Sequence, residues 1–114
     1  MNRLSLLTII ANHLDEEHYI EFLSNQNTRF KNIIHARGTA SNSVLEYFGL
    51  DEIKKVIIIS IVPFNLSKVV LKNLKEDKKI NINEPGNGIA FTIPLSSASK
   101  YMLDRYQEIE TEDI

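Results

Sequence analysis

The segment 84–91 contains the first candidate for a ligand-binding loop, because Gly86, Asn87 and Gly88 stand directly before a run of strand-forming residues. Glycine has no Cβ, so the backbone around it adopts unusual angles and lets a ligand come close. Successive N–H groups in such a loop point outward together and bind phosphate oxygens. A tight turn that uses Gly-x-Gly for its geometry alone explains the same residues, because the pair by itself is a weak motif.

The segment 35–43 is the second candidate and stands at the end of an expected strand. Gly38 and Thr39 follow Arg37, whose guanidinium can pair with an anion. The alternative is a strand end followed by a helix cap, which accounts for the polar residues at 41–43. Together, the two segments mark places where separate parts of the chain can approach one ligand.

Other kinds of chemistry have little support. His13 and His18 are five residues apart, unlike the i, i+4 spacing of a helical metal pair, and His35 stands alone. The chain has no cysteine, which excludes a disulfide, a thiolate metal site and a cysteine nucleophile. No Gly-x-Ser-x-Gly motif supports serine-based catalysis. We expect no catalytic residues, no metal site and no enzymatic activity.

Composition and charge narrow the class of protein. The 114 residues, of which 43% are hydrophobic and 25% charged, indicate one small globular domain. With 13 Lys and Arg against 15 Asp and Glu, the chain lacks the positive field of a nucleic-acid-binding protein. No run approaches the ~20 apolar residues of a membrane span, and residues 1–11 lack the pattern of a secretory signal. We therefore expect a cytoplasmic protein without direct membrane insertion.

Hydrophobic periodicity predicts the elements that position these segments. Aliphatic and β-branched runs predict strands over residues 4–11, 30–39, 54–62 and 89–95. One helix is expected to follow the N-cap Asn12, and a second to begin near Asn65 with Leu66, Val69, Val70 and Leu74 on its buried face. A short helix is expected over 43–48, where Ser43 and Glu46 have capping-box spacing.

The order strand, helix, strand, strand, helix, strand predicts an α+β fold, the ferredoxin-like βαββαβ sandwich. We expect residues 1–95 to form this domain and 96–114 a C-terminal extension with an acidic tail. Two helices cover only one face of a four-stranded sheet, yet the strands are apolar on both faces. Self-association would bury the second face. The alternative is that the C-terminal segment folds back over it.

Three pieces of the chain together resemble the nitrogen-regulatory PII family, as a divergent PII-like member. They are Arg-Gly-Thr-Ala-Ser at 37–41, Val-Ile-Ile-Ile-Ser-Ile-Val-Pro at 56–63, and Pro-Gly-Asn-Gly-Ile-Ala-Phe-Thr-Ile-Pro at 85–94. The resemblance implies a homotrimer that binds adenine nucleotides in clefts between subunits. It also implies that the loop after the second strand engages a regulated partner, such as a membrane transporter or a metabolic enzyme.

The resemblance also implies which residues bind the ligand and the partner. No cofactor is required, and the expected small-molecule effector is AMP, ADP, ATP or a cyclic nucleotide. The implied ligand-binding residues are Gly38, Thr39, Ile61, Gly86, Asn87, Gly88, Lys100 and Arg105. The implied partner-binding residues are Ser43, Tyr47 and Phe48.

Three departures from the family pattern change the residues around the ligand, and the loss of a lysine and of an arginine removes positive charge. Ile89 replaces the phosphate-binding lysine, Ala40 replaces a glutamine, and Lys100 and Met102 stand where the family has two arginines. Each lost charge-assisted hydrogen bond is worth roughly 1.5–3 kcal/mol. A less charged ligand than ATP, such as AMP, a cyclic nucleotide or a small anion, therefore fits better.

The leading hypothesis is a non-enzymatic signal-transduction trimer that senses a nucleotide-like metabolite. Two alternatives remain. A ligand-free structural or interaction module of the same fold is suggested by Ile89. A small trimeric metal-handling protein is suggested by the histidines alone.

Overall fold

The computed structural model describes residues 4–26, 28, 31–38, 53–84 and 86–99. The expected short helix over 43–48 and most of the C-terminal extension lie outside these residues. No helix in the described ranges is long and apolar enough to cross a membrane.

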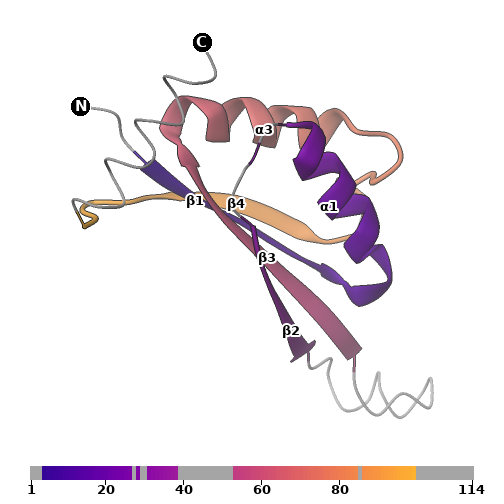
Figure 1. Cartoon of the computed structure of the whole chain (residues 1–114). Helices are drawn as coiled ribbons and strands as arrows, with labels where there is room; N and C mark the ends of the chain where they lie inside the picture. Colours follow the sequence, from indigo (N-terminus) through magenta and orange to yellow (C-terminus); the bar gives the residue numbers. More distant parts are fainter. Residues whose placement is uncertain (1–3, 27, 29–30, 39–52, 85, 100–114) are drawn as a thin grey trace.

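The described residues form four strands and two α-helices, in the order expected for a ferredoxin-like domain. The elements are β1 (Leu4–Asn12), a 3₁₀ turn (His13–Asp15), α1 (Glu16–Asn25), β2 (Asn32–Gly38), β3 (Ile53–Pro63), α3 (Phe64–Glu76) and β4 (Ile89–Pro94). The strands make one antiparallel sheet in the order β2-β3-β1-β4. Both helices pack on the same face of this sheet (Figure 1). The predicted α+β class and ferredoxin-like arrangement are confirmed.

Asn12 is an N-cap as predicted, but the segment that it caps is a 3₁₀ turn and the α-helix begins later. The Asn12 side-chain oxygen accepts a hydrogen bond from the Leu14 N–H at 3.0 Å. The capped segment is the 3₁₀ turn His13–Asp15, and α1 starts only at Glu16. A tighter i→i+3 turn at the start of a helix uses the same capping residue, so the sequence pattern does not distinguish the two.

The core lies between the sheet and the helix layer. Alternate residues of β1 and β3 face α1 and α3 because successive strand side chains point to opposite faces. The core residues from these four elements are Leu7, Ile9, Ala11, Tyr19, Phe22, Leu23, Val56, Ile58, Val62, Val70 and Leu74.

One residue predicted to lie in the core of the second helix is exposed. The buried stripe of α3 runs through Ser67, Val70 and Leu74. Val69 lies about 100° around the helix from Val70 and is 52% exposed. The apolar pattern could not separate these two valines, because either is compatible with a stripe through Leu66.

The opposite face of the sheet is apolar and has no covering layer among the described residues. Strand pairing places Ile89 beside Ile10, Ile10 beside Ile57, and Ile57 beside Ile34, in one row across the sheet. The largest exposed side chains on this open face are Ile34 at 47%, Ile89 at 58%, Phe91 at 38% and Ile93 at 46%. Apolar surfaces of this kind are typical of interaction sites. Self-association and covering of this face by the C-terminal segment both stay predictions, because residues 100–114 lie outside the described residues.

Ser5 is buried at 0% exposure, and its hydroxyl has no hydrogen-bond partner among the described residues. An unpaired buried hydroxyl costs free energy, so Ser5→Ala is expected to raise the free energy of unfolding by about 1 kcal/mol. Ser67 is the matched control, because it is equally buried and its hydroxyl donates to the Phe64 carbonyl at 2.7 Å. Urea unfolding should show Ser67→Ala neutral or destabilising; equal losses in both variants would contradict this account of Ser5.

Candidate functional site

The loop between α3 and β4 is ordered by its own hydrogen bonds before it reaches the glycine pair. The Asp77 carboxylate accepts from the Ile80 N–H at 2.9 Å, and the Asp77 carbonyl accepts from the Asn81 N–H at 2.9 Å. Asn81 has a φ of 50°, a left-handed conformation that asparagine tolerates better than most residues. Its side-chain amide donates to Glu84 Oε2 at 3.0 Å. These hydrogen bonds give residues 77–84 of the loop a defined shape.

Asn87 extends this network into the glycine pair. Its N–H donates to the Glu84 carbonyl at 3.1 Å. Its side-chain nitrogen donates to the carbonyls of Asn81 at 2.9 Å and Ile80 at 3.4 Å. Asn87 is one of the predicted ligand-binding residues, and its side-chain nitrogen is occupied in hydrogen bonds within the loop.

Gly86 and Gly88 have different surroundings. Both have positive φ angles, 92° and 133°. A Cβ added at Gly86 would meet nothing within 4 Å, so the backbone there is open to an approaching group. A Cβ added at Gly88 would lie 2.8 Å from the Tyr19 hydroxyl and 3.0 Å from the Ile10 carbonyl oxygen. Gly86 leaves room for a ligand, whereas Gly88 lets the loop lie directly on α1 and β1.

Tyr19 of α1 contacts the loop from the side of the core. Its hydroxyl donates to the Asn87 carbonyl at 2.8 Å, and the residue is only 1% exposed. Burial, assisted by the negative charge of Asp15, raises the pKa of Tyr19 to about 12. In the sequence, the i, i+3, i+4 spacing of Tyr19, Phe22 and Leu23 indicates only the apolar face of a helix. A signal was present, since a buried tyrosine usually finds a hydrogen-bond partner.

The remaining predicted ligand residues do not meet within one chain. Gly38 pairs with Ile53 on β3 at one edge of the sheet, whereas Gly88 precedes β4 at the other edge. Three strand spacings separate these edges, about 14 Å. Ile61 lies on the open face beside Leu6 of β1, nearer the opposite end of the sheet from Gly88. Within the described part of one subunit, Gly38, Ile61 and Gly88 therefore do not form a single site.

Six of the predicted site residues lie outside the described ranges, so their roles stay predictions. The ligand-binding residues among them are Thr39, Lys100 and Arg105, and the partner-binding residues are Ser43, Tyr47 and Phe48.

The histidines occupy separate positions. His35 Nε2 donates to Glu16 Oε1 at 2.6 Å, which ties β2 to the start of α1. His13 Nδ1 donates to the Lys54 carbonyl at 3.3 Å. Among the described residues, no three His, Asp or Glu side chains lie together as a metal site.

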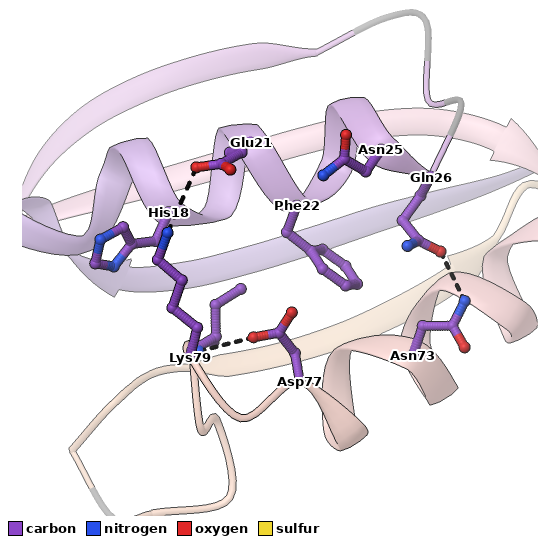
Figure 2. Close-up of a pocket in the computed structure, with 9 residues that line it drawn as sticks. His18, Glu21, Phe22, Asn25, Gln26, Asn73, Asp77 and Lys79 are labelled. Atoms are coloured by element: carbon purple, nitrogen blue, oxygen red, sulfur yellow. Dashed lines mark hydrogen bonds and ion pairs between the residues drawn. The ribbon is translucent and has the colours of Figure 1, made fainter.

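A polar groove of about 260 Å³ lies between α1 and α3, where sequence patterns indicated no site (Figure 2). The buried side chains of Phe22 and Ile80 contribute its apolar part. An amide pair crosses it, in which Asn73 donates to Gln26 at 2.7 Å. The ion pair of Lys79 with Glu21 is long, at 3.7 Å, and both side chains are more than 60% exposed, so it contributes little stability.

Gly88→Ala is expected to be far more damaging than Gly86→Ala. At Gly88 the new Cβ clashes with Tyr19 and backbone in addition to straining φ, so a loss of about 2–4 kcal/mol in unfolding free energy is expected. Gly86→Ala has open space and only the φ strain, about 1–2 kcal/mol. Thermal and urea unfolding measure both changes. Equal losses would show that Gly88 does not pack as described.

The raised pKa of Tyr19 predicts a loss of stability in base. Below pH 10.0, the ordinary pKa of tyrosine, the hydroxyl keeps its proton in both the folded and the unfolded chain, so Tyr19 makes its full contribution to the free energy of unfolding. Between 10.0 and about 12 the unfolded chain releases the proton first, so stability falls as pH rises. Phenylalanine in Tyr19→Phe has no hydroxyl proton to release, so the variant lacks this source of pH dependence. Urea unfolding should therefore show a steeper decline for the wild type than for the variant in this range; parallel declines would contradict the assignment.

Similarity to known proteins lies in the fold. Neither a protein-family model nor a curated protein matches this chain. The PII-like protein CPII from Thiomonas intermedia K12, solved with ADP, AMP and bicarbonate, superposes with a TM-score of 0.62 at 18% identity, covering 85% of this chain and 94% of that one. A PII-like signalling protein from Thermus thermophilus gives 0.61 at 22% identity, covering 82% and 86%.

The divalent ion tolerance protein CutA1 from Ehrlichia chaffeensis is equally similar in shape, with a TM-score of 0.62 at 15% identity over 95% of each chain. Similarity at these identities establishes architecture. This chain has the ferredoxin-like fold shared by PII-like proteins and CutA1, as the sequence resemblance implied.

Proposed function

We propose that this chain is a PII-like signal-transduction protein. It forms a homotrimer, binds an adenine nucleotide in clefts between subunits, and regulates a partner protein such as a transporter or a metabolic enzyme. It catalyses no reaction, and the nucleotide is an effector that reports on metabolism.

The ordered glycine loop is the observation that carries this proposal. Internal hydrogen bonds fix the loop, and the backbone at Gly86 is open to a ligand. A preformed loop binds phosphate without first losing conformational entropy. Support comes from CPII, which has the same fold and was solved with ADP and AMP.

The open sheet face supports the assembly. Its exposed isoleucines and Phe91 leave an apolar surface that a second copy can bury. Ile61 belongs to this face, and Gly38 and the glycine loop lie at opposite edges of one sheet. Neighbouring copies packed through this face can combine the edge of one subunit with the loop of another.

The chemistry beside the loop favours a ligand with few phosphates. Ile89 follows the glycine pair directly, and its side chain is exposed on the open face. An aliphatic side chain cannot neutralise a triphosphate. AMP, ADP or a cyclic nucleotide is therefore favoured over ATP.

Two other functions are compatible with the fold. A ligand-free interaction module would keep the assembly and bind no nucleotide. A metal-handling protein would agree with the CutA1 similarity, although the described residues bring no three metal-binding side chains together. The ordered loop gives the nucleotide proposal the stronger support.

Light scattering and calorimetry test the proposal. The expected mass is three times 13.1 kDa, with AMP or ADP binding more tightly than ATP. Flat titrations with AMP, ADP, ATP, cyclic AMP and bicarbonate would overturn the ligand part, and a monomeric mass would overturn the trimer. Stoichiometric metal in the purified protein would favour the CutA1-like function.

Gly86→Asp and Gly86→Asn form a matched pair that tests the loop itself. Both side chains have nearly the same shape and tolerate positive φ, but only aspartate adds a negative charge beside the proposed phosphate. Gly86→Asp is expected to weaken nucleotide binding at least about ten-fold more than Gly86→Asn. Equal affinities, measured by calorimetry on folded variants, would place the phosphate elsewhere.

A further inference from the structure

We propose that Tyr19 is a positioning residue for the ligand-binding loop. Its hydroxyl fixes the orientation of the peptide group between Asn87 and Gly88. This inference rests on the proposed function, because the loop matters only if it binds a ligand. Tyr19 itself is buried in the core beneath the loop and contacts no ligand.

The argument begins with the planarity of the peptide group. The carbonyl that accepts the Tyr19 hydroxyl belongs to Asn87, and the N–H of the same peptide unit belongs to Gly88. The described residues contain no cis peptide bond. In a trans peptide the C=O and N–H point in opposite directions. With the carbonyl drawn at 2.8 Å to a buried hydroxyl, the Gly88 N–H is directed away from the core.

Contacts on either side of this peptide keep it from rotating. Gly88 lies so close to the Tyr19 hydroxyl and the Ile10 carbonyl that even a Cβ would not fit. On the other side, the Asn87 side chain donates to the carbonyls of Ile80 and Asn81. The Tyr19 hydroxyl, on α1, provides the third contact, and it is the one that sets the direction of the Asn87 carbonyl.

An N–H group that already points toward an approaching anion contributes more to binding free energy than one that must first reorient, because no conformational entropy is lost in orienting it. Without the hydroxyl, the Asn87 carbonyl would be left beside a phenyl ring and would turn toward water. The Gly88 N–H would turn with it, since the peptide is one rigid unit. Ligand affinity should therefore depend on a side chain that never touches the ligand.

The test compares Tyr19→Phe with Thr28→Val. Thr28 is a matched control because its buried hydroxyl donates to the Leu23 carbonyl at 2.7 Å, just beyond the far end of α1 from Tyr19. Each substitution removes one buried hydroxyl-to-carbonyl hydrogen bond and keeps the shape of the side chain. Both variants are expected to lower the thermal midpoint by a similar amount.

Titration with AMP and ADP should separate the two variants. Tyr19→Phe is expected to weaken binding about three- to ten-fold, whereas Thr28→Val keeps the wild-type affinity. If both variants bind as the wild type does, the positioning role is wrong and the proposed function stands. If both lose affinity equally, the effect is one of general stability and the positioning role is also wrong.

Hydrogen exchange without ligand gives a second readout that does not depend on nucleotide binding. The Asn87 amide, whose N–H donates to the Glu84 carbonyl, should exchange faster in Tyr19→Phe than in the wild type and be unchanged in Thr28→Val. If the wild-type protein binds no nucleotide, the proposed function fails and this comparison shows only whether Tyr19 orders the loop. Unchanged exchange, or failure of Tyr19→Phe alone to fold, would overturn the positioning role.

Discussion

The contact between Gly88 and Tyr19 is the constraint on which the geometry of the loop depends. It brings together three elements that are separate in sequence, since Tyr19 lies on α1, Ile10 on β1 and Gly88 at the entry to β4. A side chain at 88 or a missing hydroxyl at 19 would separate the loop from the core. The direction of the loop's backbone is thus decided inside the protein, by packing that a ligand never contacts.

The order of the strands places a second constraint on function. Because β1 and β3 occupy the centre of the sheet, β2 and β4 become its two edges. Residues that resemble parts of one ligand site therefore lie at opposite edges of a single subunit. In the same fold, one apolar face of the sheet is not covered by the described elements. On the proposed function, copies that pack through this face would bring the separated site residues of different subunits together.

Sequence patterns predicted the architecture well and the details of the site less well. Long apolar runs predicted both ends of β3 and the start of α3 to within one residue, because burial of one face dominates their energetics. Periodicity could not separate Val69 from Val70, nor a 3₁₀ turn from a helix after Asn12. The glycine pair was found by its spacing, but the role of Tyr19 depends on contacts between residues 68 positions apart. Such contacts exist only once the chain has folded.

The open face of the sheet also links folding to concentration. Where an apolar surface of one subunit is buried only against another, association stabilises the native state by mass action, and dilution withdraws that stabilisation. The exposed isoleucines of β4 and β2 would then contribute to stability in proportion to how much protein is present. On the proposed function, the fraction of chains that is folded and able to bind ligand would then rise with the total concentration of the protein.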